Sequence, residues 1–279
     1  MATAGDTRGV ARSTLVVTVL VAAALVTSGC GDPLTLRATS TSTAGRPAPV
    51  PSTPMPSSSS GPSTTASEEP AIAPSVSATP PSSEPGLAPV VHRIETTDKV
   101  VFITIDDGYT KDPQVVDLLA RRHVPVTSFL AVAALQTDHE YFAQVQKATG
   151  QLVQDHTMTH PFLSRYGYDR QKREICDAAD QLGTWYGTRP WLFRPPYGDY
   201  SRTTRRAAYD CGMTALVLWD VSLPHAVLRY ASGSHFQPGD ILLVHWRPHL
   251  ARDLPVALDA IERAGLHVAA LQDYLPRPS

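Results

Sequence analysis

Two short motifs in this sequence have the residue types and spacing of a metal site. Asp106 and Asp107 are adjacent and precede Gly108, and His156 and His160 lie four residues apart. Two histidines at this spacing share one face of a helical turn, where both ring nitrogens can bind one ion. A carboxylate would complete a set of three ligands that leaves positions open for water and substrate. Each motif also has a plainer interpretation, as a common turn and as a surface loop.

The two carboxylates end an apolar, β-branched segment at 100–105 that is typical of a buried strand. Side chains alternate along a strand, so we expect Asp106 and Asp107 to point in different directions. One carboxylate could then bind a metal while the other faces substrate or water. Gly108 would allow the sharp turn that follows.

Three more polar positions follow predicted strands. Arg194 opens the run Arg-Pro-Pro-Tyr-Gly, in which the prolines could stiffen the chain and let the guanidinium hold a carboxylate in one orientation. Asp220 follows Trp219, and His245 ends an apolar run. The plainer interpretations are a proline-rich surface loop for Arg194 and a buried structural histidine for His245.

The elements that must carry these residues alternate between short apolar runs and helical stretches. We expect strands at 100–105, 126–130, 152–154, 191–193, 215–218, 241–244 and 267–269. We expect helices at 113–122, from a cap at Asp138 to 149, and at 169–186, 203–211 and 252–264. This α/β alternation implies a parallel sheet with crossover helices, and about seven strand–helix units favour a barrel over an open sheet. Barrel enzymes keep their chemistry at strand ends, where these polar motifs lie.

Taken together and in order, the motifs resemble those of the polysaccharide deacetylases, the family 4 carbohydrate esterases. This family includes chitin, peptidoglycan and acetylxylan deacetylases. The motifs are Thr104-Ile105-Asp106-Asp107-Gly108, His156-Thr157-x-x-His160, Arg194-x-Pro196-Tyr197-Gly198 and Leu243-x-His245. The resemblance covers about residues 99–273 and implies a distorted, incomplete (β/α) barrel that removes acetyl groups from an acetylated glycan.

The resemblance also implies a metal and a base. Asp107, His156 and His160 would bind a divalent metal, usually zinc, with cobalt and nickel as alternatives. Asp106 would be the general base that takes a proton from the attacking water, and Arg194 would orient Asp106. These roles agree with the chemistry of a metal-assisted hydrolysis.

For the other two motifs, the backbone N–H of Tyr197 would stabilise the oxyanion and His245 would be the general acid. One departure affects that acid, because the family's Asp-Trp pair aligns with His225-Ala226 here. The usual carboxylate partner of His245 is therefore missing, and Asp220 and His225 are the candidates to replace it. Trp246 is a candidate to rebuild part of the apolar wall of the acetyl pocket.

The N-terminal part of the chain predicts export. Arg8 and Arg12 precede an apolar run at 15–26 that is too short to span a bilayer, and the run ends in Thr27-Ser28-Gly29-Cys30. This end resembles the lipobox of bacterial lipoproteins, although Thr27 replaces the usual Leu; a plain secretory signal is the alternative. We expect a lipoprotein signal peptide at 1–29, lipidation of Cys30 and an extracytoplasmic, membrane-anchored protein.

The next segment is expected to be a disordered tether at 30–92, followed by one catalytic domain at 93–279. Twelve prolines fall between Pro47 and Pro89, among Ser, Thr and Ala, so this stretch cannot bury enough apolar surface to fold. Cys176 and Cys211 could form a disulfide in an exported protein, or remain two buried thiols.

The charge composition argues against one class of binding partner. The net charge is −2 and the pI is about 6.5, which argues against a nucleic-acid binder. We expect a monomer whose substrate is an N-acetylglucosamine polymer or peptidoglycan, with an ester as the alternative to an amide. The other functions considered are a non-catalytic, metal-containing lipoprotein that binds glycan and an amidase acting on another small C–N bond.

Overall fold

The computed structural model describes residues 84–278. The predicted signal peptide, the lipidation site at Cys30 and most of the predicted tether lie outside the described residues. Among residues 84–278, no helix is both long and apolar enough to cross a membrane.

Nine strands lie side by side in one sheet, in the order β1-β6-β5-β4-β3-β2-β9-β7-β8, and β10 pairs with β2. Among the strands of residues 84–278, only the β7–β8 pair is antiparallel. The two ends of this order, β1 and β8, do not pair with each other among the described residues, so the barrel is incomplete. The strands are β1 Val90–Val91, β2 Val100–Asp107, β3 Val126–Leu130, β4 Gln154–Asp155, β5 Leu192–Phe193, β6 Ala215–Val217, β7 Val221–Ser222, β8 Arg229–Tyr230, β9 Ile241–His245 and β10 His267–Val268.

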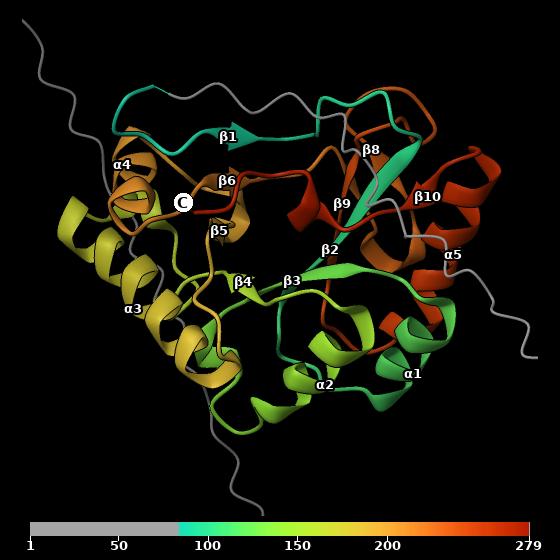
Figure 1. Cartoon of the computed structure of the whole chain (residues 1–279), viewed down its shortest axis with the longest axis horizontal. Helices are drawn as coiled ribbons and strands as arrows, with labels where there is room; N and C mark the ends of the chain where they lie inside the picture. The colour runs from blue at the N-terminus through green and yellow to red at the C-terminus, as the bar shows by residue number, and fades with distance from the viewer. Residues whose placement is uncertain (1–83, 279) are drawn as a thin grey trace, which may run out of the picture. The chain divides into compact units, whose positions relative to one another are not determined.

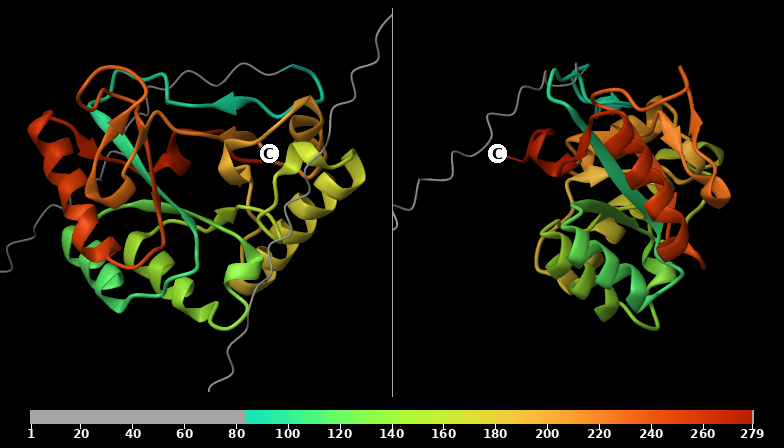
Figure 2. Two further views of the ribbon diagram at one scale, coloured as in Figure 1. Left: turned by 180° about the vertical axis from the view of Figure 1, so that it is seen from behind. Right: turned by 90° about the vertical axis from the view of Figure 1, so that its right-hand side faces the viewer.

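The helices surround this sheet, with α1 and α2 adjacent, α3 and α4 packed together, and α5 on the side away from α3 and α4 (Figures 1 and 2). The α-helices are α1 Pro113–Arg122, α2 Glu140–Thr149, α3 Tyr168–Tyr186, α4 Arg202–Asp210 and α5 Leu250–Arg263. The 3-10 helices are η1 Val132–Ala134, η2 Leu163–Arg165, η3 Pro196–Gly198, η4 Pro224–Ala226 and η5 Leu271–Asp273. The α/β fold and the incomplete barrel predicted from the sequence are confirmed.

Local sequence explains several helix boundaries. The side chain of Asp112 accepts a hydrogen bond from the Gln114 N–H, and Pro113 occupies the first position of α1. Ser201 and Thr204 form a capping box at the start of α4. These caps satisfy backbone N–H groups that the helices leave without partners.

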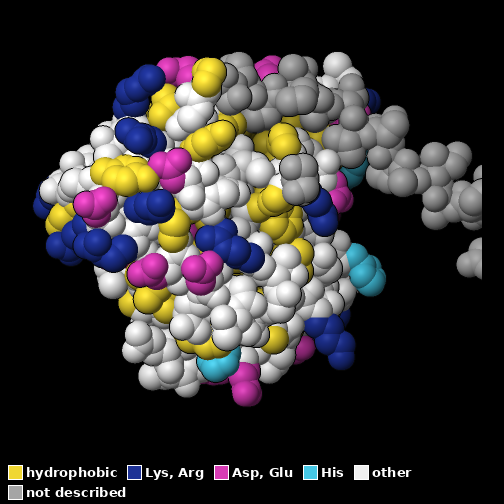
Figure 3. All heavy atoms as spheres, turned by 60° about the vertical axis from the view of Figure 1, so that its left-hand side comes forward, with side chains coloured by type: hydrophobic (Ala, Val, Ile, Leu, Met, Phe, Trp, Pro, Cys, Tyr) yellow, Lys and Arg dark blue, Asp and Glu magenta, His cyan; other side chains and the backbone are white. Residues whose placement is uncertain are grey.

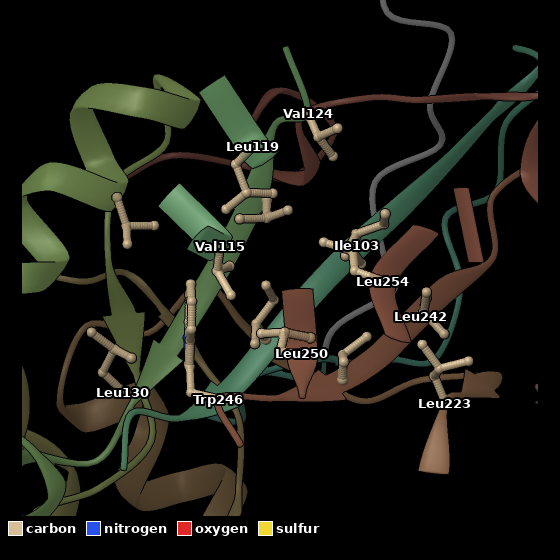
Figure 4. Packing of buried hydrophobic residues seen from close by; sticks show 14 of the residues in the cluster. Ile103, Val115, Leu119, Val124, Leu130, Leu223, Leu242, Trp246, Leu250 and Leu254 are labelled. Carbon is tan, nitrogen blue, oxygen red and sulfur yellow. The ribbon is translucent and has the colours of Figure 1, made fainter. Parts of the chain in front are cut away.

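The core lies where the sheet meets these helices. Strand β2 is buried along its whole length. The largest apolar cluster joins β2, β3 and β9 to α1 and α5, and the indole of Trp246 lies inside it near Val115 and Leu250 (Figure 4). Trp246 is only 1% exposed, so its side chain packs in the core next to the end of β9. It does not form the wall of an open pocket.

Several predicted boundaries were wrong. Helix α2 is capped at His139 without a side-chain hydrogen bond, so Asp138 is not its cap. Strand β4 begins at Gln154, two residues later than predicted. No α-helix follows β6 directly; two short strands and a 3-10 helix replace the expected alternation there. The first described residues, 84–92, contain β1, which pairs with β6, so the folded region begins upstream of Arg93.

Cys176 of α3 and Cys211, just after α4, form a disulfide. The bond joins the two helices that pack together on one side of the sheet. In the view that brings this side forward, Lys and Arg side chains are interspersed with Asp and Glu (Figure 3). This face therefore has no extended region of a single charge.

Candidate active site

The predicted site residues lie at the carboxyl ends of neighbouring parallel strands. Asp106 of β2 is opposite His245 of β9 in the strand register. The backbone N–H of Trp246 donates to the Asp106 carbonyl at 3.0 Å, which keeps the end of β9 on β2. Arg194 follows β5, and its backbone N–H donates to the carbonyl of Asp155 in β4. The sheet thus brings together residues that are far apart in the sequence.

Asp106 and Arg194 form a buried ion pair. The Nη1 of Arg194 donates to Oδ1 of Asp106 at 2.7 Å, and neither side chain is more than 3% exposed. The guanidinium also donates to Oγ1 of Thr104 and to the carbonyls of Val217 and Leu218. Burial lowers the pKa of Arg194, and the charge of Asp106 opposes that shift. Arg194 is therefore held in one orientation, and one oxygen of Asp106 is fixed by it.

Asp107, His156 and His160 form a compact group of possible metal ligands, with one ligand atom from each lying within 4.8 Å of the others. Oδ1 of Asp107 is 3.1 Å from Nε2 of His160 and 3.6 Å from Nε2 of His156. Ligand atoms about 2.0–2.2 Å from a tetrahedral zinc ion would be roughly 3.4 Å apart. The three residues therefore fit a single divalent cation. Burial raises the pKa of Asp107, but hydrogen bonds and charges of the two histidines outweigh it and leave this pKa below its usual value.

The ring of His156 is oriented for this role. Its Nδ1 lies 2.7 Å from the carbonyl oxygen of Arg194, which can only accept, so Nδ1 carries the proton. Nε2, which faces Asp107, is then the ring nitrogen available to bind a metal, as in metal sites where the second ring nitrogen binds a backbone carbonyl. Oδ2 of Asp106 is 3.8 Å from the same Nε2, so the base candidate lies beside the ligand group.

Backbone geometry, and not strand alternation or a helical turn, brings these groups together. Asp107 has φ 77°, which rotates the end of β2 so that both carboxylates approach His156. The two histidines lie in a loop and not on a helix, with Thr157 at φ 76° and His160 at φ 59°. Our expectations that the carboxylates diverge and that the histidines share a helical turn were wrong. Gly108 suits this turn, because side chains other than glycine rarely adopt its φ of 103°; a Cβ would also lie 2.7 Å from the side chain of Leu135, which would have to shift.

Two carboxylates that the sequence reasoning missed hold the histidine loop. Oδ1 of Asp155 accepts from the Thr157 N–H at 2.7 Å, and burial raises the pKa of Asp155 well above its usual value. Glu174 of α3 accepts from both the N–H and the hydroxyl of Thr159. Glu174 lies on the apolar stripe of an amphipathic helix, and a carboxylate in that position was the signal available in the sequence.

Tyr197 lies in the tight turn after β5, with φ 62°. Its hydroxyl is 3.2 Å from Nδ1 of His160, and its ring stacks on Phe162 with centroids 3.9 Å apart. Both rings are exposed. The side chain of Tyr197 is therefore at the exposed rim of the ligand group.

His245 borders a pocket of about 560 Å³ that lies between the η4 region and the start of α5. Burial lowers the pKa of His245, while Asp106 and Asp107 oppose the shift. No hydrogen bond joins His245 to a described residue. Asp220 does not replace the missing partner, because its N–H donates to Ile241, at the opposite end of β9. His225 lines the same pocket as His245, whereas Trp246 does not.

An incomplete barrel with one carboxylate and two histidines at its strand ends defines the class of protein. A family model described as Polysaccharide deacetylase matches residues 93–216. A peptidoglycan-N-acetylglucosamine deacetylase of Bacillus cereus is 31% identical over 171 residues, which cover 56% of this chain and 76% of the relative. The chain belongs to the polysaccharide deacetylase family.

Two further comparisons extend this result. An uncharacterized protein of Streptomyces coelicolor is 40% identical over 195 residues, 68% of this chain and 78% of the relative. A solved CE4 family pseudoenzyme from Bacillus anthracis shares the fold with a TM-score of 0.57 and 19% identity, over 66% of this chain and 68% of that chain. The family-model match ends at residue 216, before His245.

Proposed function

We propose that the protein is a metal-dependent hydrolase that removes acetyl groups from an N-acetylglucosamine polymer or peptidoglycan. The observation that carries this proposal is the convergence of Asp107, His156 and His160 beside the Asp106–Arg194 pair. Zinc is the proposed cation, with cobalt or nickel as alternatives, because two imidazoles and a carboxylate suit these metals. The chemistry that a divalent cation supplies in such a site is polarisation of a carbonyl and a lower pKa for water.

Three residues of the chain would act as the base, the oxyanion donor and the acid. Arg194 occupies Oδ1 of Asp106, so Oδ2 is the oxygen left to take the proton of the attacking water. The backbone N–H of Tyr197 donates to the oxygen that becomes negative in the acetyl group. His245, on the neighbouring strand, gives a proton to the leaving amine, which is a poor leaving group without it.

Acetate release tests this proposal. The purified protein with zinc is given acetylated chitooligosaccharides, peptidoglycan fragments and acetylated peptides, and Asp106→Asn serves as the control that keeps the metal ligands. We expect acetate from the sugars, little from the peptides, and a loss of rate of at least about 100-fold in Asp106→Asn. Release from peptides alone would favour an amidase acting on another C–N bond.

A non-catalytic, glycan-binding protein is the second candidate. It is favoured by His225-Ala226 in place of the family's Asp-Trp pair and by the absence of a described hydrogen-bond partner for His245. The pseudoenzyme of similar fold gives a precedent for this outcome. Binding of the glycans without acetate release at any pH would support this candidate over the enzyme.

We also propose that the protein is exported and held at the membrane by a lipid on Cys30. The support is the basic and apolar N-terminal segment, the cysteine after Thr27-Ser28-Gly29 and the proline-rich stretch that follows. Such a spacer would let the domain reach a polymer beyond the membrane. Cys30→Ser should move the protein from the membrane fraction to the soluble fraction, and continued membrane fractionation would rule out the anchor.

A further inference from the structure

The pocket beside His245 has an unusual set of charges. Arg229 of β8 and Arg247, just after β9, both line it, together with the imidazoles of His225, His245 and His249. The only carboxylate among its lining residues belongs to Asp253. The pocket therefore offers more cationic and hydrogen-bond donor groups than acceptors.

The existing ion pairs leave this positive charge largely uncompensated. Oδ1 of Asp253 is already paired with Nε of Arg252 at 2.9 Å, and Arg252 does not line the pocket. Within the described range, the side chain of Arg229 makes no ion pair or hydrogen bond, although its backbone belongs to the β7–β8 pair. Arg247 lies 3.7 Å from Oδ2 of Asp107, and its side chain is 66% exposed, so it can also reach the pocket. A second anion would satisfy these two guanidinium groups.

The location of the pocket connects it to the reaction. Its wall includes His225 of η4 and His245, the proposed general acid. At about 560 Å³, it is in the size range of small-molecule sites. Because His245 lies in its wall, a group that occupies the pocket would lie beside the proposed general acid.

We propose that this pocket binds a negatively charged substituent, a carboxylate or a phosphate, on or next to the acetylated sugar, through Arg229 and Arg247. This inference rests on the proposed function and narrows its substrate class to anionic acetylated glycans. Arg229 and Arg247 determine specificity, while the ligand group and Asp106 remain the site of reaction.

Binding to matched glycans tests the proposal without turnover. The full chain with zinc and the Asp106→Asn change is titrated by calorimetry with three oligosaccharides of equal length. One is built from N-acetylglucosamine only, one contains N-acetylmuramic acid with its free carboxylate, and one carries a phosphate. We expect one or both anionic glycans to bind about ten-fold more tightly than the neutral one, with an advantage that shrinks at high salt.

Variants identify the residues responsible. Arg229→Gln and Arg247→Gln should each remove most of the anionic advantage and change the affinity for the neutral glycan less than about two-fold. Arg121→Gln, an exposed arginine of α1 that pairs only loosely with Asp117, is the matched control and should change neither affinity. The methyl ester of the muramic acid oligomer should bind like the neutral glycan.

The outcomes separate this inference from the proposed function. Equal affinities for all three glycans, or an anionic advantage that survives in Arg229→Gln and Arg247→Gln, would overturn the anion pocket even if the wild-type protein releases acetate. An anionic advantage that depends on both arginines, with no acetate release by the wild-type protein, would support the pocket and reject the enzyme.

Discussion

Replacing Arg194 by Leu should cost the protein a large part of its stability, because it leaves the carboxylate of Asp106 buried without its partner. Arg194 is fully buried and its guanidinium makes four hydrogen bonds, of which the one to Asp106 is an ion pair. Breaking a buried pair by removing one partner costs about 3–5 kcal/mol. For a domain of this size, that loss lowers Tm by roughly 6–20 °C.

Urea and thermal unfolding measure this effect, with a chelator present so that metal binding does not contribute. The double variant Asp106→Leu/Arg194→Leu removes both charges, so its loss should be smaller than the sum of the two single losses by about 2 kcal/mol or more. Arg194→Lys keeps the charge but cannot reach all four acceptors, and its loss should be intermediate. A loss below about 1 kcal/mol in Arg194→Leu, with strictly additive single changes, would refute the reasoning.

Three further predictions concern the surroundings of the site. Glu174→Ala should weaken zinc affinity about ten-fold, because the N–H and the hydroxyl of Thr159 both lose their acceptor, and Glu174→Gln should weaken it less. Competition with a chelating dye measures both affinities, and an unchanged affinity would contradict the role of Glu174 in holding the histidine loop. Replacing Cys176 and Cys211 by Ser should lower the free energy of unfolding by roughly 3–4 kcal/mol, given a separation of 35 residues, and urea unfolding of the oxidised proteins checks it. Trp246→Ala should cost about 3–5 kcal/mol in the same assay, whereas a residue of an open pocket wall would cost little.

The sequence predicted those elements that are defined by local signals. Helix α1 and strand β3 have the predicted bounds, because a proline start, basic residues at the helix end and a continuous apolar run are all encoded locally. The motifs also pointed to residues that the structure brings close together: Asp107 lies near His156 and His160, and Asp106 pairs with Arg194. Strand β4 was misplaced because two residues carry no periodicity, and its position is determined by pairing with β3 and β5.

The local geometry of the site could not be predicted in the same way. Asp107, Thr157, His160 and Tyr197 all have positive φ, a conformation that is uncommon for residues other than glycine. Tertiary contacts favour it, such as the hydrogen bond from the Val132 N–H to the Thr157 carbonyl. The sequence therefore predicted regular strand and helical-turn geometry at positions where the structure has positive φ angles. The charge of the pocket likewise depends on segments that are distant in the chain, such as those that carry Arg229 and Arg247.

Zinc titration by calorimetry tests the central claim most directly. The claim is that Asp107, His156 and His160 together hold one divalent cation beside Asp106. The wild-type protein should bind one zinc ion per chain. Replacing any of the three ligands by Ala should abolish or greatly weaken that binding, whereas Asp106→Asn should retain it. Full stoichiometric binding with wild-type affinity in His156→Ala or Asp107→Ala would contradict the claim.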